Sequence, residues 1–278
     1  MKYFILSLIL LCCSVFVKGQ NQYSAEPSPV LLKERWEAEW ITCPESSLYD
    51  YGVYHFRKTL TLNSRLDSFI INISADNRYR LFVNGRPVCW GPARGDIYHC
   101  YFDTVDIAPL LRPGKNVLAV LVWNFGNYTP GAQMTLKTGL IVQGNTSLEA
   151  QANTDKSWKV YHDPAYSPSI EYLQDVGCSD ILNASLYPWG WENLDYNDAD
   201  WIEARTIGRG QPYGIGSGYD WILCKRDIPF LKKYDTKIIV NVCGHAPEEY
   251  LAVVERLADE PIDMMEINIS CPNVNAGF

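Results

Sequence analysis

Short strand-like runs separated by turn residues dominate positions 36 to 150, and this pattern constrains the fold more than any other feature. No stretch there repeats apolar residues at the helical period over three turns. The runs with alternating or β-branched residues are 69–74, 79–83, 116–124 and 135–142. Asn84-Gly85 closes the second run, and Asn-Gly between strands is a strong hairpin signal. The pattern predicts a mostly β protein whose body is an antiparallel sandwich.

The charge balance argues against nucleic acid as a partner. The 278-residue chain has a net charge of −8, and an acidic protein repels a phosphate backbone. Aromatic residues make up 13% of the chain, and all nine Trp lie between Trp36 and Trp221. Aromatic rings can stack on sugar rings, so the body's composition permits carbohydrate binding. The tail has no Trp and differs in composition from the body.

Residues 1–19 have the pattern of a signal peptide. Lys2 supplies positive charge, residues 3–17 form an apolar run, and Val17-Lys18-Gly19 is a small-x-small cleavage site. We expect export to the periplasm or the medium, with Gln20 as the first mature residue. A buried first helix is the alternative. Outside this leader, no run is long and apolar enough for a membrane span.

Cysteine spacing gives no indication of a metal site. Nine Cys, less Cys12 and Cys13 in the leader, leave seven, and none has C-x-x-C spacing. We therefore expect no zinc site. Cys89 and Cys100 flank a Gly-rich stretch and could pair across a hairpin. The alternative is two unpaired, small apolar side chains.

The tail shows a strand, helix and strand pattern. Residues 237–242 form a near-continuous apolar run. Pro247 and the acidic residues after it are typical of a helix start. Residues 264–269 form a second apolar run. The pattern predicts a βαβ unit, which requires a parallel sheet.

Several ordered motifs of the body resemble the N-terminal region of bacterial α-L-rhamnosidases. They are WEAEWI (36–41), YHFRK (54–58), SADNRYRLFVNG (74–85), GPARGD (91–96), LRPGKNVLAV (111–120), GWEN (190–193), YNDADW (196–201), WIL (221–223) and RDIP (226–229). The resemblance covers residues 23–231. It implies a galactose-binding-like β-sandwich at 23–150 and a second β region of the same family at 151–228. The family's glycosidase chemistry resides in a later barrel, which this sequence lacks, so the resemblance implies a binding module.

Asp76 and Asn77 are the candidate sugar-binding residues of this module. We expect them at a surface loop after a strand, where carboxylate and amide oxygens can hold sugar diols or Ca²⁺. Trp90 and Trp123 offer stacking faces. The alternatives are a simple turn at Asp76-Asn77 and core packing of the tryptophans. The implied partner is a rhamnose-containing glycan, and the sequence leaves the oligomeric state open.

The run NISCPNV (268–274) resembles the active-site signature of class 1 dihydroorotate dehydrogenases, and PFLKKYDT (229–236), NVCG (241–244) and EEY (248–250) match the same family. These enzymes are FMN-dependent (β/α)8 barrels. By this resemblance Cys271 is the catalytic base, Asn268 contacts flavin and substrate, Asn241 contacts flavin, and Asn273 contacts substrate. Residues 229–278 cover only part of a barrel that needs about 250 residues. We therefore expect neither bound FMN nor turnover from this chain.

The two resemblances meet at residues 226–231, which indicates a fusion of two gene fragments, of natural or assembly origin. Three functions follow. The main expectation is an exported carbohydrate-binding module of a rhamnosidase-like protein without its catalytic barrel. The alternative is an FMN-dependent dihydroorotate dehydrogenase fragment from pyrimidine biosynthesis, inactive because its barrel is incomplete. The third is an enzymatically inert fusion product.

Overall fold

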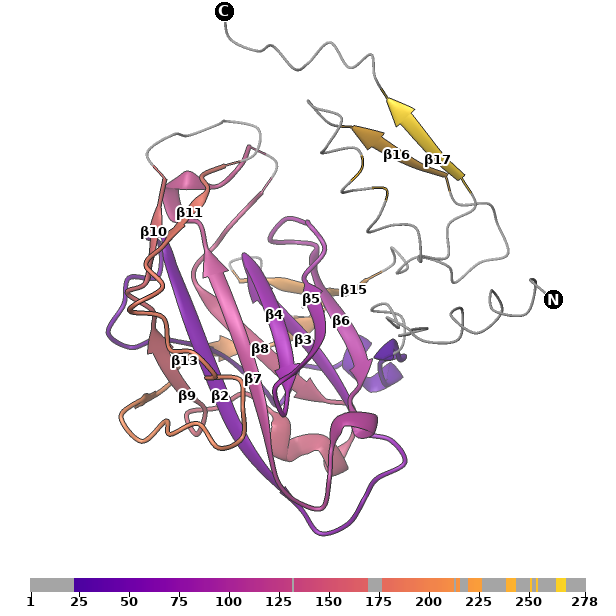
Figure 1. Ribbon diagram of the computed structural model, residues 1–278. Helices are drawn as coiled ribbons and strands as arrows, with labels where there is room; N and C mark the ends of the chain where they lie inside the picture. The colour runs from indigo at the N-terminus through magenta and orange to yellow at the C-terminus, as the bar shows by residue number, and fades with distance from the viewer. Residues whose placement is uncertain are drawn as a thin grey trace, which may run out of the picture. The chain divides into compact units, whose positions relative to one another are not determined.

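The structure is a computed structural model that describes residues 23–131, 133–169, 177–212, 214–215, 220–226, 239–243, 251, 254 and 264–268 (Figure 1). The chain divides into two compact units, one of which spans Tyr23–Ile228. The leader lies outside the described residues, so export stays a prediction. Among the described residues, no helix is long and apolar enough to cross a membrane.

One layer of the larger unit is a six-stranded antiparallel sheet. Its strands, in spatial order, are β12 (Ile202–Glu203), β9 (Lys159–His162), β2 (Gly52–Leu62), β7 (Gly114–Asn124), β4 (Arg78–Val83) and β5 (Arg86–Gly91). The two longest strands, β2 and β7, pair along their whole length, from Gly52 opposite Asn124 to Leu62 opposite Gly114. The hairpin between β4 and β5 turns at Asn84 and Gly85, which have positive φ values of 51° and 80°. This is the conformation that the Asn-Gly signal predicts.

The other layer is a seven-stranded sheet. Its strands, in spatial order, are β13 (Arg205–Arg209), β1 (Glu39–Thr42), β8 (Gly139–Gly144), β3 (Ile70–Asp76), β6 (Cys100–Asp106), β15 (Ile222–Lys225) and β14 (Gln211–Pro212). The pairings from β13 to β6 are antiparallel, whereas β15 pairs parallel to both β6 and β14. A short antiparallel pair, β10 (Tyr166–Pro168) and β11 (Asp180–Leu182), stands apart from both sheets. Four 3-10 turns complete the described unit: η2 (Pro29–Leu32), η3 (Ala108–Leu110), η4 (Gly126–Tyr128) and η5 (Ser147–Ala152).

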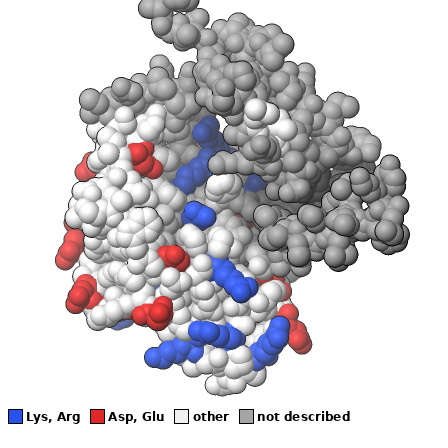
Figure 2. Space-filling model, viewed as in Figure 1, with Lys and Arg blue, Asp and Glu red and all other residues white. Residues whose placement is uncertain are grey.

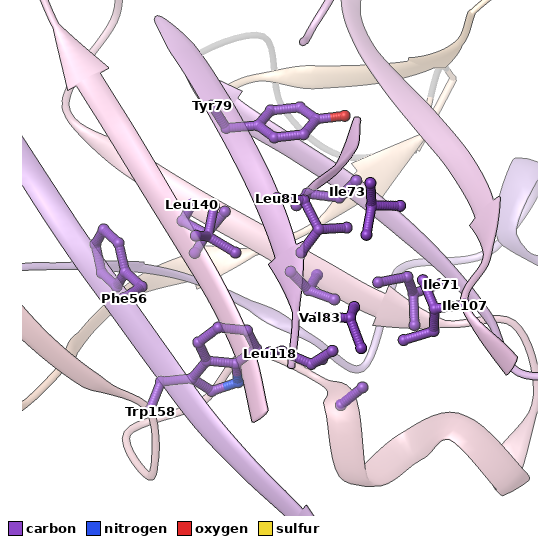
Figure 3. Close-up of a cluster of buried hydrophobic side chains, with 14 of the residues drawn as sticks. Phe56, Ile71, Ile73, Tyr79, Leu81, Val83, Ile107, Leu118, Leu140 and Trp158 are labelled. Atoms are coloured by element: carbon purple, nitrogen blue, oxygen red, sulfur yellow. The ribbon is translucent and has the colours of Figure 1, made fainter. Parts of the chain in front are cut away.

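The main hydrophobic core lies between the two sheets. Alternate residues of β4 point inward, so Tyr79, Leu81 and Val83 are buried, while Arg80 between the first two is exposed. Figure 3 shows these side chains packed near Ile71 and Ile73 of β3. Because burial of each such side chain stabilises the fold by about 1.5–3 kcal/mol, this shared interior holds the layers together.

The described strands confirm a mostly β protein. Residues 151–226 supply strands to both sheets, since β9 pairs with β2 and β15 pairs with β6. The body is therefore one sandwich in which the two sequence stretches interleave. Cys89 and Cys100 are both buried free thiols, as the unpaired alternative predicts.

The second unit contains a parallel strand pair. β16 (Ile239–Cys243) pairs with β17 (Met264–Asn268), with Asn241 opposite Glu266 and Cys243 opposite Asn268. Leu251 and Val254, which lie between these strands in the sequence, are helical. Parallel strands need a crossover connection, which agrees with the strand order predicted for the tail. A barrel is not part of the described structure.

Candidate functional site

The candidate site is a hollow at one end of the sandwich. It is bounded by the turn after β5, by the segment before β8 and by Trp221, and Asp76 and Asn77 lie at its base. Its volume is about 330 Å³, including open solvent. A wider hollow of about 840 Å³ shares Gly95, Asp96 and Tyr101 with it. The two therefore form one continuous depression, which we call the end hollow.

The base of the end hollow is a buried carboxylate held by N–H donors. Asp76 Oδ2 accepts hydrogen bonds from the backbone N–H of Leu136 at 2.6 Å and of Lys137 at 3.2 Å. The indole N–H of Trp221 donates to the same oxygen at 3.0 Å. Burial raises the pKa of the Asp76 carboxyl, and these donors oppose the rise. The carboxylate thus ties together three chain segments that are distant in sequence.

Asn77 is fixed just as firmly. Its Oδ1 accepts from the backbone N–H of Phe125 at 2.8 Å, and its own backbone N–H donates to the carbonyl of Trp123 at 2.8 Å. Its Nδ2 donates to Asp76 Oδ1. The peptide bond between Asp76 and Asn77 is cis. All the polar groups of this amide side chain therefore bond within the protein.

The expectation that Asp76 and Asn77 lie at a surface loop is wrong. Asp76 closes β3, and the two residues are only 4% and 2% exposed. The physical reason is that Trp221 and the segment before β8 cover them. The base also does not suit Ca²⁺, because Asp76 faces N–H donors and Asn77 presents an N–H to it. No cluster of three or more His, Cys, Asp or Glu within the described ranges could hold a metal ion.

One wall of the end hollow is an aromatic stack. Trp221 lies on Trp40 with ring centroids 4.1 Å apart and an interplanar angle of 22°. Lys137 Nζ lies 5.2 Å from the Trp221 ring centroid and pairs with Asp220 at 3.0 Å. The contacts with Trp40 and Lys137 and the hydrogen bond to Asp76 fix the position of the buried indole.

The rim carries polar side chains that can reach a ligand. Asp96 accepts from the backbone N–H of Tyr98 at 2.8 Å and of His99 at 2.9 Å, and His99 Nδ1 lies 3.0 Å from the same oxygen. These bonds set the shape of the turn after β5. Arg94, Tyr101 and the exposed Met134 complete the rim. The rim therefore offers a carboxylate, an imidazole, a phenol and a guanidinium around an apolar wall.

The structure separates the aromatic candidates from Asp76 and Asn77. Trp90 is 64% exposed on β5 and lies opposite Arg80 of β4, while Trp123 is half-buried on β7. Neither lines the end hollow. Sequence reasoning missed the functional potential of Trp221, Tyr101 and His99. The GPARGD motif at 91–96 forms part of the rim and could have indicated it. No local sequence pattern indicated that Trp221 lies in the wall of the end hollow.

The dehydrogenase-like residues are described only in part. Cys271 and Asn273 lie outside the described residues. Asn241 is in β16, and Asn268 is the last residue of β17. In the pairing of β16 with β17, Asn241 lies opposite Glu266. Asn268 therefore lies two residues further along β17 than the partner of Asn241.

The sandwich has a counterpart among solved structures. A crystal structure of the GH78 family rhamnosidase of Bacillus sp. GL1 matches 71% of this chain, with a TM-score of 0.62 and 30% sequence identity. The chain spans only 20% of that enzyme's length. The resemblance of the body to rhamnosidases is therefore confirmed.

The curated proteins that are similar in sequence are dihydroorotate dehydrogenases, not rhamnosidases. The catalytic subunit of dihydroorotate dehydrogenase B from Lachnoclostridium phytofermentans is 60% identical over 141 residues, which are 48% of this chain and 44% of that protein. The same subunit from Alkaliphilus metalliredigens is 57% identical over 53 residues, or 19% of this chain and 18% of that protein. The chain thus spans less than half of these relatives. No family model matches it. The two resemblances together confirm the suspected fusion of rhamnosidase-like and dihydroorotate dehydrogenase-like parts.

Proposed function

We propose that the body is an exported carbohydrate-binding module and that the end hollow binds a rhamnose-like sugar. The observation that carries the proposal is the end hollow itself, with its polar rim and the exposed apolar side chain of Met134. Sugar sites combine an apolar surface for the ring with a few placed hydrogen-bonding groups for the hydroxyls. The likeness to the GH78 rhamnosidase supports this choice of ligand class.

The rim supplies the groups that such a ligand needs. Tyr101 and Asp96 line both parts of the end hollow, whose wider part measures about 840 Å³ including open solvent, and the exposed Met134 offers apolar surface. A sugar hydroxyl can donate to the Asp96 carboxylate in a charge-assisted hydrogen bond, which is stronger than a neutral one.

We propose binding without hydrolysis. Glycoside hydrolysis needs two carboxyl groups on either side of the scissile bond, one of them free to transfer a proton. The end hollow is lined by two carboxylates. Asp76 is held by N–H donors at the base, and Asp96 accepts bonds from its own turn. Neither is placed as a free acid opposite a nucleophile.

Calorimetric titration of the full chain with L-rhamnose tests this function. We expect a dissociation constant on the order of 1 mM, because a monosaccharide makes few contacts. Tyr101→Phe removes one rim hydroxyl and should weaken binding about threefold to tenfold. Tyr49→Phe is the matched control, since Tyr49 is 64% exposed and does not line the end hollow.

The result that contradicts the proposal is equal rhamnose affinity in the two variants, or no binding by the unmodified chain. Repeating the titration in Ca²⁺ and in EDTA separates a metal-dependent sugar site from the one described here. The same affinity in both buffers is the expected result. N-terminal sequencing of the secreted protein tests export, and the expected first residue is Gln20.

A second candidate function rests on the 60% identity to dihydroorotate dehydrogenase B over 141 residues. We propose that the tail derives from an FMN-binding barrel whose site residues include Asn241, Asn268, Cys271 and Asn273. The FMN chemistry of such an enzyme is hydride transfer from the substrate. A purified full chain mixed with FMN, dihydroorotate and an electron acceptor should show no turnover above a Cys271→Ala variant. A turnover rate above that of the Cys271→Ala variant would show that the chain is an active oxidoreductase.

A further inference from the structure

Three arginines lie close together beside the end hollow. Arg78 begins β4, Arg94 is in the turn after β5, and Arg226 follows β15. Burial, followed by the positive charges of Arg94 and Arg226, lowers the pKa of the Arg78 guanidinium. Like charges are thus gathered here in a chain whose net charge is −8. Figure 2 shows basic side chains close together in the upper middle of the described surface, apart from most acidic side chains in view.

The carboxylate of Asp103 lies among these arginines and is bonded on both oxygens. Asp103 is buried, and its Oδ1 accepts from Arg226 Nη1 at 2.9 Å. Its Oδ2 accepts from the hydroxyl of Tyr79 at 2.5 Å. Neither Arg78 nor Arg94 has a carboxylate within ion-pair distance anywhere in the described part of the chain. Among the described residues, no ion pair offsets the positive charges of Arg78 and Arg94.

Of the two arginines without a carboxylate, Arg94 lines the end hollow, and Arg78 bonds to a residue of its wall. Arg94 is exposed and lines the wider part. Arg78 is half-buried and donates from Nη1 to the carbonyl of Pro92 at 2.5 Å, and Pro92 lines the narrower part. A structural role explains Arg78 in part, because this bond fixes the turn. Arg94 has no carboxylate partner within the described ranges, and it lines the part of the end hollow that a bound sugar would reach.

We propose that the end hollow prefers an acidic sugar to a neutral one such as rhamnose, with the carboxylate or sulfate group held by Arg94 and supported by the charge of Arg78. A guanidinium presents a planar fork of donors that matches either anion in two parallel hydrogen bonds. The local positive charge also attracts an anionic ligand to an otherwise acidic protein. This inference rests on the proposed sugar-binding function and specifies its ligand class. The neighbouring Asp96, already bonded to His99, repels an anion on its own side and so directs the acidic group toward Arg94.

Calorimetry of the full chain with matched sugars tests the proposal. The probes are D-glucose, D-glucuronate and D-glucose 6-sulfate, which differ only at the sixth carbon. At least one acidic probe should bind about tenfold tighter than glucose, because a charge-assisted pair replaces a neutral contact. The acidic probe with the larger gain in affinity over glucose identifies the preferred anion as a carboxylate or a sulfate. Raising NaCl from low to high concentration should reduce the advantage, since salt screens exposed charges.

Arg94→Gln should abolish the preference for the acidic probe. Arg112→Gln should preserve it, because Arg112 is equally exposed but lies outside the end hollow. Both side chains are at the surface, so thermal unfolding of the variants should match that of the unmodified chain. Equal affinity for acidic and neutral probes, or the same preference in both variants, would overturn the inference. Rhamnose titration of the unmodified chain separately decides the proposed function, and rhamnose binding without acidic preference overturns only the inference.

Discussion

The indole nitrogen of Trp221 donates a hydrogen bond to the buried carboxylate of Asp76 at 3.0 Å, across 145 positions of sequence. Trp221 directly precedes β15, and Asp76 ends β3, so this bond joins the last described strand of the body to the centre of the same sheet. The contact also sets the base and one wall of the end hollow. Stability of the sandwich and shape of the site are therefore linked.

Replacing Trp221 by Phe should remove this donor while keeping an aromatic ring against Trp40. A buried carboxylate that loses one partner costs about 1–3 kcal/mol. We expect the free energy of unfolding, measured by denaturant titration, to fall by that amount. Trp90→Phe is the control, because Trp90 is 64% exposed and should change stability little. Equal stability of the two variants would contradict the role assigned to the Asp76 bond.

Asp76→Asn should change how stability depends on pH. Burial raises the folded-state pKa of Asp76 above its ordinary value of 3.8, so the folded state binds a proton more tightly than the unfolded state does. The group's stabilising contribution is complete below that ordinary value and is lost as pH rises through the folded pKa. The unmodified chain should therefore lose stability relative to the variant as pH increases from 4 to 7.

Unfolding free energies of both proteins across that pH range provide the measurement. Asn at position 76 also places an amide N–H among N–H donors, so the variant should be less stable overall. Asp67→Asn, an exposed substitution, should show no pH-dependent difference. A constant gap between Asp76→Asn and the unmodified chain would show that the carboxyl is not perturbed.

Arg57 should hold the segment around residues 191–198 on the outer face of the six-stranded sheet. Its Nε donates to Asp198 at 2.8 Å, its Nη1 donates to the carbonyl of Asn193 at 3.0 Å, and its guanidinium lies 5.3 Å from the Tyr196 ring centroid. Arg57→Met removes these contacts, although Lys159 still pairs with Asp198 at 3.3 Å, and should cost about 1–3 kcal/mol. Limited proteolysis should then cut this segment faster.

The adjacent residue offers a matched comparison. Lys58 pairs with Asp155, which is 51% exposed, and a surface pair contributes about 0–1 kcal/mol. Lys58→Met should therefore leave both unfolding and proteolysis nearly unchanged. Similar effects in the two variants would mean that Arg57 does not anchor the segment.

Local sequence signals predicted well the strands whose residues alternate between buried and exposed or are rich in β-branched side chains. The runs at 69–74, 79–83 and 116–124 correspond to β3, β4 and β7, and Asn84-Gly85 forms the hairpin. These features follow from side-chain alternation and turn chemistry within a few residues. The run at 135–142 began too early, because Leu136 and Lys137 bond to Asp76 and β8 starts at Gly139.

The site could not be predicted in the same way, because it is assembled from distant segments. A polar pair after a strand usually indicates a loop, and nothing near Asp76 reveals that Trp221 covers it. Likewise, no periodicity indicates that β9 joins β2 or that β15 joins β6. Pairings of this kind depend on tertiary packing, which overrides local pattern.

A crystal structure of the full chain soaked with L-rhamnose tests the proposed sugar site most directly. One sugar should lie in the end hollow, within hydrogen-bonding distance of Tyr101 and Asp96 and against Met134. Sugar density on the exposed face around Trp90, with an empty end hollow, would contradict it.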